Sequence, residues 1–222
     1  MKIFALLSPT WGLAYFLKNH LDRTKTIRTL NSFYLGISVL SIASIIIAQH
    51  LEKRLIVEGM YNSLPISLVI LWSAFLISRN NEIFWAFLND AFDKMKVKNI
   101  KKTKIYECKS ASSLLTPKDR IVLSLKSYLE LVFNFSIIYS LINKSLWKSE
   151  LPLSITDFIY YSGITITTTG YGDITPLHPL SQLLSVYEVF CGVLLLVVCF
   201  AIYAGRLEDS ACGCHDDISS SA

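Results

Sequence analysis

Apolar residues gather in four stretches of this chain, and polar or charged segments separate them. A helix that spans a bilayer needs about 20 mostly apolar residues. Residues 31–51, 121–143 and 180–204 are long enough, and a shorter run at residues 64–78 becomes long enough if its helix begins near Asn62. The pattern therefore predicts four membrane-spanning helices.

The composition agrees with a membrane protein and argues against a soluble domain. Hydrophobic residues make up 52% of the 222 residues and charged residues only 17%, and the mean hydropathy is +0.45. Ordinary soluble domains are less apolar than this. The five cysteines do not form the paired framework of a secreted protein. Near the C-terminus, "CGCH" (Cys212, Cys214 and His215) offers too few ligands for a tetrahedral metal site, so we expect no resident cofactor.

The distribution of positive charge predicts the orientation. Basic residues gather before the first apolar run, and ten Lys or Arg lie between Arg79 and Arg120. The positive-inside rule places both regions in the cytoplasm of a plasma (inner) membrane protein, and four spans then return the C-terminus to the cytoplasm.

Residues 81–96 within the second basic region have the pattern of an interfacial amphipathic helix. The lysines in and after it either bind anionic lipid headgroups or form a solvated face that only sets the topology: Lys94, Lys96, Lys98, Lys101, Lys102 and Lys104.

A polar segment, "TITTTGYGDITP" at residues 165–176, stands between the last two apolar runs. Lipid does not tolerate irregular polar backbone unless protein buries it or water lines it. Gly170 and Gly172 permit positive φ, so successive carbonyls can turn to the same side. Such a row of carbonyls, with a threonine hydroxyl at its inner end, can replace the water shell of a cation. Because the chain has one such strand, four subunits would be needed to surround an ion.

This segment resembles the selectivity-filter signature of potassium channels, T-x-x-T-V-G-Y-G-D. The resemblance covers about residues 120–206, as an outer helix, pore helix, filter and inner helix similar to the two-transmembrane pore module of prokaryotic potassium channels. Together with the four apolar runs, the resemblance leads us to expect an all-α integral membrane protein with four transmembrane helices, a re-entrant pore helix and a selectivity filter, assembled as a homotetramer. The implied function is passive, K⁺-selective conduction, with K⁺ as the permeant ion and no enzymatic activity.

The resemblance also implies a role for each filter residue. K⁺ would bind the backbone carbonyls of four successive residues, Thr168, Thr169, Gly170 and Tyr171. The Thr168 hydroxyl would form the innermost site and Gly172 would complete the outer mouth. Tyr171 and Asp173 would turn their side chains away from the ions and brace the filter. Thr169 replaces the usual valine of the family, and its additional hydroxyl needs a hydrogen-bond partner.

Residues before the filter are expected to hold it in place. Ser154 or Thr156 can cap the start of the pore helix. Tyr160 and Tyr161 occupy the place where relatives pack aromatic residues around the filter, and we favour that role over one as simple interfacial tyrosines.

The last apolar run carries the expected gating residues. Glu188 is costly inside a membrane and would brace the back of the pore helix. Gly192 lies where the resemblance places a hinge glycine, and close helix packing is an alternative or additional role. If the register transfers, three residues spaced by four line the cavity and inner gate: Leu196, Phe200 and Ala204.

The expected organisation has five parts. They are a cytoplasmic or interfacial segment (1–30), a two-span hairpin (31–80), a basic amphipathic linker (81–119), the pore domain (120–206) and a short cytoplasmic tail (207–222). No span carries arginines at every third position, so a voltage-sensor helix is not expected. In the outer helix, Lys126 and Glu130 could pair, although we favour Lys126 reaching toward the headgroups.

Two other functions fit the residues. Thr169 leaves open a weakly selective cation pore. A membrane effector or regulatory subunit that acts through the basic segment is the alternative from another class.

Overall fold

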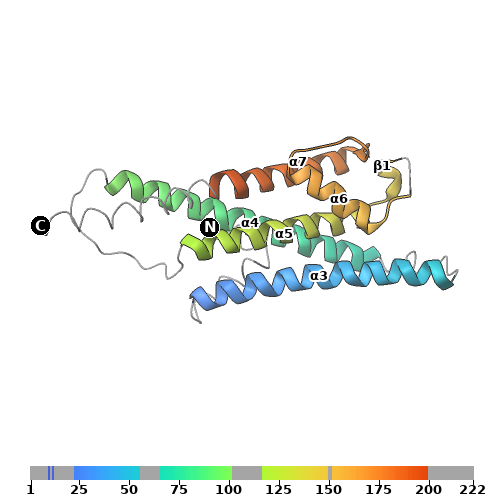
Figure 1. Cartoon of the computed structure of the whole chain (residues 1–222), viewed down its shortest axis with the longest axis horizontal. Helices are drawn as coiled ribbons and strands as arrows, with labels where there is room; N and C mark the ends of the chain where they lie inside the picture. The colour runs from blue at the N-terminus through green and yellow to red at the C-terminus, as the bar shows by residue number, and fades with distance from the viewer. Residues whose placement is uncertain are drawn as a thin grey trace, which may run out of the picture.

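The computed structural model describes residues 10, 12, 23–55, 66–101, 117–149 and 152–199, and in these ranges the chain is mostly helical, as predicted (Figure 1). The helices are α3 (Arg23–Leu55), α4 (Ile66–Lys101), α5 (Pro117–Leu141), α6 (Ile155–Ile166) and α7 (Pro179–Val193). The short elements are the 3₁₀-helix η2 (Lys144–Leu146), strand β1 (Trp147–Lys148), strand β2 (Thr175–Pro176) and the π-helix η3 (Leu194–Cys199), which continues α7.

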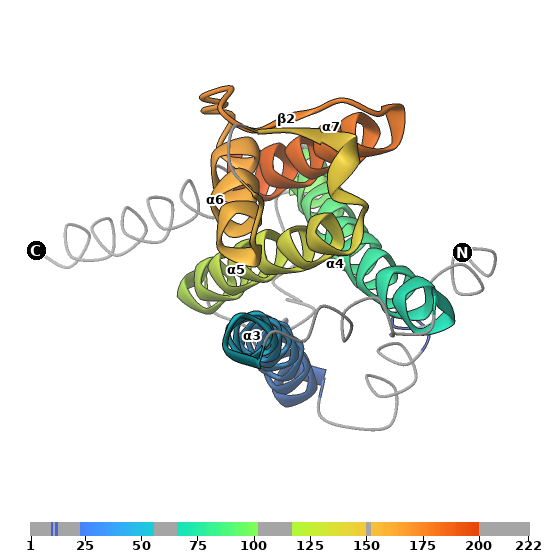
Figure 2. The same ribbon diagram turned by 90° about the vertical axis from the view of Figure 1, so that its right-hand side faces the viewer.

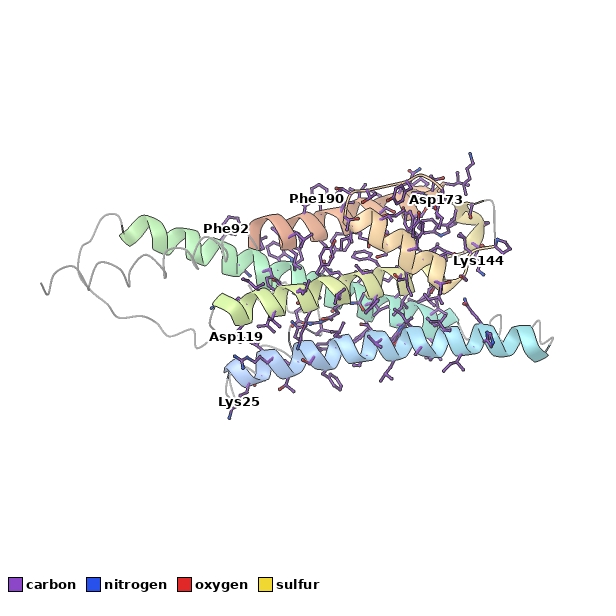
Figure 3. The ribbon with its side chains drawn as sticks, viewed as in Figure 1. Lys25, Phe92, Asp119, Lys144, Asp173 and Phe190 are labelled. Atoms are coloured by element: carbon purple, nitrogen blue, oxygen red, sulfur yellow. The ribbon has the colours of Figure 1, made fainter. Side chains whose placement is uncertain are left out.

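Helix α5 lies at the centre of the bundle. Figure 2 shows α3 on one side of it and α4, α6 and α7 around its other sides, and α5 packs against all four helices. Lys25 and Asp119 lie at one end of the bundle, whereas Lys144 and Asp173 lie at the other (Figure 3). The segment singled out in the sequence therefore lies at the end of the molecule opposite to the start of α3.

Three helices in the described ranges are long and apolar enough to cross a membrane: Lys25–His50, Asp119–Leu141 and Pro179–Leu196. They correspond to three of the four predicted spans. Helix α4 is not among them, because its described apolar stretch begins at Ile66 and meets Arg79 soon afterwards. The multi-pass character is thus supported, while the fourth span stays a prediction.

Helix α4 differs from the sequence-based expectation in its continuity. A hairpin ending at residue 80 and a separate amphipathic helix were expected, but one helix runs from Ile66 to Lys101 through that boundary. No Gly or Pro occurs in this range, and these residues are the usual causes of a break or kink. The polar residues from Arg79 onward therefore lie in the middle of a helix.

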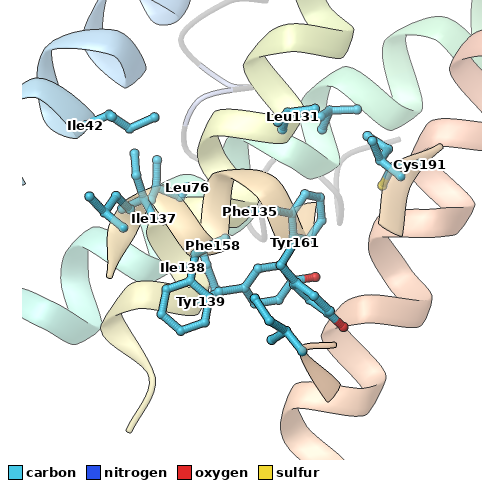
Figure 4. Packing of buried hydrophobic residues seen from close by; sticks show 14 of the residues in the cluster. Ile42, Leu76, Leu131, Phe135, Ile137, Ile138, Tyr139, Phe158, Tyr161 and Cys191 are labelled. Atoms are coloured by element: carbon cyan, nitrogen blue, oxygen red, sulfur yellow. The ribbon is translucent and has the colours of Figure 1, made fainter. Parts of the chain in front are cut away.

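The buried core joins all five helices. Figure 4 shows Ile42 of α3, Leu76 of α4 and Cys191 of α7 around side chains of α5 and α6. The central helix contributes five fully or nearly fully buried apolar residues: Leu131, Phe135, Ile137, Ile138 and Tyr139. Burial of a large apolar side chain stabilises a fold by about 1.5–3 kcal/mol when it leaves water.

Several predictions concern parts of the chain outside the described residues. Most of the N-terminal segment is outside; only Thr10, Gly12 and the residues from Arg23 onward are described there. The other predictions that fall outside concern the "CGCH" tail, Lys102, Lys104, Phe200 and Ala204. Lys94, Lys96, Lys98 and Lys101 belong to α4 by their backbone, and their side chains are likewise outside the described part.

Candidate functional site

Helix α6 begins at a cap that the sequence predicts. Ser154 is its N-cap residue, and the Asp157 carboxylate accepts hydrogen bonds from the Ser154 backbone N–H at 2.8 Å and from its hydroxyl. This interaction satisfies a backbone donor that the first turn leaves without a partner. The helix turns one face toward α5 and α7 and buries Ile155, Phe158, Tyr161, Ser162 and Ile166.

An aromatic cluster behind α6 fixes its position. Tyr139 of α5, Trp147 of β1 and Tyr161 of α6 lie with ring centroids 5.0–5.3 Å apart. Phe158 lies 5.3 Å from Trp147 in the same edge-to-face geometry, and such pairs contribute about 0.5–1.5 kcal/mol each beyond their burial. The sequence pattern points only to Tyr161 of this cluster, because the other three residues come from segments of ordinary apolar composition.

The segment after α6 is hydrogen-bonded to the end of that helix. The carbonyl of Ile164 accepts from the backbone N–H groups of Thr169 at 2.8 Å and Gly170 at 3.2 Å, and Thr168 N–H donates to the carbonyl of Thr165 at 2.9 Å. Carbonyls at a helix C-terminus lack partners within the helix. Here the candidate filter supplies them, so the filter and α6 form one unit.

Every second residue of the candidate filter has a positive backbone φ. Thr168, Gly170 and Gly172 have φ values of +59°, +55° and +84°. Positive φ is easy for glycine but is an outlier for a β-branched residue such as threonine. Strain of this kind persists only where the surroundings impose it, and it concentrates at functional sites. Alternate residues of this type allow successive carbonyls to face one side, which is the arrangement expected for a row of cation ligands.

The hydroxyl of Thr169 has a partner. It lies 3.0 Å from the Thr167 hydroxyl, and Thr167 in turn donates to the carbonyl of Gly163 at 2.7 Å. Two threonine side chains thus connect the candidate filter to the last turn of α6. This pair answers the question that the sequence raised about a hydroxyl in place of valine.

The two tyrosines before the filter have different surroundings. Tyr161 is buried in the aromatic cluster and its hydroxyl lies 2.8 Å from the Ser185 hydroxyl of α7. Tyr160 is exposed and stacks on Tyr171, with ring centroids 6.5 Å apart and planes 4° from parallel. The nearby Asp173 carboxylate raises the pKa of the Tyr160 phenol, mainly because, as a hydrogen-bond acceptor, it favours the protonated hydroxyl and also because ionisation would place two negative charges together.

A two-residue antiparallel ladder lies beside the site. Trp147 pairs with Pro176 and Lys148 with Thr175, and Leu177 N–H donates to the carbonyl of Leu146 at 2.9 Å. The ladder joins the chain before α6 to the chain after the candidate filter.

Glu188 connects the three helices of the candidate pore. It is fully buried on α7 and accepts hydrogen bonds from the Tyr139 hydroxyl of α5 at 2.6 Å and the Ser162 hydroxyl of α6. A carboxyl group buried in a membrane protein is costly without such partners. Its position directly behind α6 is the one that the bracing role predicted for Glu188 would require.

Gly192 packs against the end of α6. A Cβ atom at this position would lie 2.5 Å from the Ile166 Cγ1 and 2.9 Å from the Ile166 carbonyl oxygen. Close packing is therefore visible here, whereas the hinge role of Gly192 stays a prediction.

Gly192 is followed by η3, a π-helix that the apolar pattern does not predict. Leu196 lies in this π-helix and is half-buried. Because a π-helix closes its turns with i→i+5 hydrogen bonds, the α-helical spacing assumed for the gate residues does not hold through this segment.

The candidate filter and one face of α7 are uncovered in the single chain. Residues 167–173 are all exposed, with Tyr171 71% exposed. On α7, a stripe at helical spacing is also exposed: Leu183, Val186, Phe190 and Val193. Among the described residues no group of three or more His, Cys, Asp or Glu side chains could hold a metal ion. The oxygens offered by this site are therefore backbone carbonyls and threonine hydroxyls.

Comparison with known proteins locates a domain over the same region. Residues 127–209 match a protein family described as "Ion channel". A curated relative, the inward rectifier potassium channel Kirbac3.1 of Paramagnetospirillum magnetotacticum, is 32% identical over 102 residues, which is 45% of this chain. The chain covers 34% of the length of that relative. No solved structure matches the chain.

Proposed function

We propose that this chain is one subunit of a homotetrameric channel that conducts K⁺ selectively and passively. The match of residues 127–209 to a family described as "Ion channel" and the similarity to a potassium channel support this proposal. The observation that carries the proposal is the alternation of positive φ at Thr168, Gly170 and Gly172 in a segment anchored to α6. In this arrangement the carbonyl oxygens of the filter replace the hydration shell of K⁺ as it enters. The activity is conduction down a gradient and needs no catalytic group.

The tetramer is inferred from what one chain leaves incomplete. A single filter strand offers ligands on one side of an ion, and its polar backbone is exposed, which lipid does not tolerate. Four strands around an axis surround the ion and remove that exposure. The uncovered stripe of α7, which includes Leu183 and Phe190, is the matching apolar surface toward the axis and the neighbouring subunits.

The filter residues have the roles that the sequence predicts. K⁺ binds the carbonyls of Thr168 to Tyr171, with the Thr168 hydroxyl innermost and Gly172 at the outer mouth. Asp173, Tyr160, Tyr161 and Glu188 support the filter from outside. Gly192 belongs to the proposed hinge, and Leu196, Phe200 and Ala204 belong to the proposed inner gate, where the π-helix η3 rotates the residues after Leu196 relative to an α-helix.

The proposed channel is not opened by an arginine voltage sensor. The arginine of the α4 membrane segment, Arg79, is 6% exposed and paired with Glu82 and Glu130. A voltage sensor needs several charges that can move through the field. We place the protein in the plasma (inner) membrane with its filter on the outer side and both termini in the cytoplasm.

The lysines of the basic segment are proposed to bind anionic lipid headgroups, each contributing about 1 kcal/mol near the surface. Replacing Lys101 and Lys102 with glutamine should weaken co-sedimentation with vesicles containing phosphatidylserine and leave binding to neutral vesicles unchanged. Equal binding of parent and variant to both vesicle types would mean that these lysines only set the topology.

The test of the proposed function is the current through the purified, reconstituted full chain. With unequal K⁺ and equal Na⁺ on the two sides of a bilayer, the reversal potential should follow the K⁺ gradient. Gly170→Ala should abolish selective current, because alanine is strained at a φ of +55°. Gly36→Ala is the matched control, since a Cβ there meets nothing within 4 Å. A reversal potential that ignores the K⁺ gradient would contradict the proposal, and equal K⁺ and Na⁺ permeability would indicate the weakly selective alternative.

A further inference from the structure

Four polar residues follow one another in the middle of α4: Arg79, Asn80, Asn81 and Glu82. We call these residues the polar joint. Three of them are almost fully buried, with exposed fractions of 6% for Arg79, 0% for Asn80 and 5% for Glu82. Successive residues of an α-helix point about 100° apart, so the joint presents polar groups to several neighbouring helices at one level.

Arg79 anchors α4 to α5 and α3. Its Nε lies 2.6 Å from Glu130 Oε1 and its Nη2 lies 3.1 Å from Glu130 Oε2, which is a bidentate pair with the central helix. Its guanidinium also forms an ion pair with Glu82 at 2.9 Å and lies 4.1 Å from the centre of the Tyr34 ring. Removing one partner of a buried ion pair leaves a charge without compensation, so this contact behaves as a fixed attachment.

Asn80 also links α4 to α5 and α3, through a second set of polar contacts. Its Oδ1 accepts a hydrogen bond from the Asn134 side-chain amide of α5 at 2.8 Å, and the Asn134 Oδ1 accepts from the Ser38 hydroxyl of α3 at 2.6 Å. Helices α3, α4 and α5 are therefore held in one register by two adjacent polar layers.

Asn81 contacts the inner helix instead. The Tyr187 hydroxyl of α7 donates to Asn81 Oδ1 at 2.7 Å, and α4 also packs against η3. Tyr187 precedes Glu188 directly and lies five positions before Gly192. This is a single neutral hydrogen bond in a partly buried place, so it can break and reform far more easily than the Arg79–Glu130 pair.

Helix α4 continues beyond the joint without a break. It runs on to Lys101, which is about 28 Å past Glu82 at 1.5 Å per residue. Without Gly or Pro in this length, a displacement of its basic end is transmitted to the joint rather than absorbed at a kink. The exposed stripe of α7 that includes Leu183 and Phe190 is separate from the buried face that carries Glu188 and Cys191, so α4 reaches the inner helix without occupying the side proposed for the pore axis.

We propose that the polar joint couples α4 to the opening of the channel, with Arg79 and Asn80 anchoring α4 to the outer helix while Asn81 positions the inner helix through Tyr187. Asn81 and Tyr187 are positioning residues, because neither touches the permeant ion. The inference rests on the proposed function, and it assigns a regulatory role to an N-terminal helix that lies outside the matched residues 127–209.

The test compares Asn81→Leu, Tyr187→Phe and the double variant of the full chain in planar bilayers. Each single variant should change the open probability by about two- to tenfold, the range expected for one neutral hydrogen bond, and both should change it in the same direction. The double variant should match the singles rather than multiply their effects. Unitary conductance and the K⁺ reversal potential should equal those of the parent, which separates a change of gating from damage to the filter.

Two substitutions serve as controls. Tyr128→Phe removes a buried hydroxyl that has no hydrogen-bond partner among the described residues, and Asn89→Leu changes an exposed asparagine on α4; neither should alter the open probability. If Asn81→Leu fails to form tetramers in detergent, Tyr187→Phe against Tyr128→Phe decides the question. Unchanged open probability in Tyr187→Phe, or independent effects of the two singles, would overturn the inference alone. Absence of K⁺ current in the parent would instead overturn the proposed function and the inference with it.

Discussion

Gly192 of the inner helix lies directly against Ile166, the last residue of α6. The space between them is too small for a methyl group, since a Cβ at position 192 would come within 2.5 Å of the Ile166 side chain and 2.9 Å of its carbonyl oxygen. The candidate filter begins at Thr168, two residues after Ile166. The inner helix and the base of the filter are therefore in contact through a glycine, and a change at one side of this contact is felt at the other.

Gly192→Ala is expected to act on the filter as well as on gating. Overpacking of this kind costs about 1–3 kcal/mol, and Ile166 can give way only by shifting the start of the filter. Single-channel recording should show a lower unitary K⁺ conductance together with any change in open probability. A pure hinge would predict an altered open probability with unchanged conductance, and Gly36→Ala should change neither because its added methyl group has space.

Thr169→Val is expected to keep K⁺ selectivity and to weaken the attachment of the candidate filter to the end of α6. Valine has nearly the same shape and the same carbonyl, but it loses the hydroxyl contact with Thr167, worth about 0.5–1.5 kcal/mol. Current recorded at low external K⁺ should therefore decline faster with time than in the parent. Thr169→Ser, which keeps the hydroxyl, should behave like the parent. A valine variant that is as stable as the parent would show that the contact does not hold the filter.

Glu188→Ala is expected to destabilise the fold. The substitution removes the acceptor of the buried Tyr139 hydroxyl, whereas the Ser162 hydroxyl keeps the Val132 carbonyl at 3.0 Å. A buried donor left without its acceptor costs about 1–3 kcal/mol. The midpoint of thermal unfolding in detergent should fall by about 2–4 °C for every kcal/mol lost. Tyr139→Phe and Ser162→Ala should each cause a smaller fall. In the Glu188→Ala background, neither should add to it, and additive effects would mean that the three residues do not act together.

Glu130→Leu is expected to be among the most harmful single changes outside the filter. It leaves Arg79 buried with Glu82 as its remaining acidic partner, and breaking a buried pair costs about 3–5 kcal/mol. The triple variant Arg79→Leu/Glu82→Gln/Glu130→Leu should be more stable than Glu130→Leu, because it leaves neither an arginine nor a glutamate buried without its partner. Breaking the more exposed Arg28–Asp119 pair with Arg28→Ala should cost about 0–1 kcal/mol. Thermal unfolding of all four proteins provides the comparison.

The start of α6 and much of the backbone after it are predictable from sequence because their determinants are neighbours in the chain. Ser154 and Asp157 are three residues apart and form the cap by themselves. Gly170 and Gly172 permit the positive φ that they adopt. Thr168 is less predictable, because its side chain disfavours a φ of +59°, and its conformation follows from hydrogen bonds to the preceding helix.

The polar joint is not predictable in the same way. An arginine and two asparagines after an apolar run have the local appearance of a membrane boundary, so the sequence suggested that a span ends there. Their partners Glu130 and Tyr187 lie 51 and 106 residues away in the chain, and no local pattern points to them. The same holds for Lys126 and Glu130: Lys126 donates to the Ser32 hydroxyl, while Glu130 binds the distant Arg79. No pattern predicts the π-helix η3 either, since its sequence is uniformly apolar.

The short ladder between β1 and β2 has a consequence for exchanging parts between channels. It brings the chain back at Thr175 to the place that it left at Lys148, so α6 and the candidate filter lie in one segment whose two ends are paired. The entropy of closing such a loop depends only weakly on its length. A foreign pore loop can therefore be longer or shorter than the native one and still fit between the same two helices, provided that its ends keep the pairing.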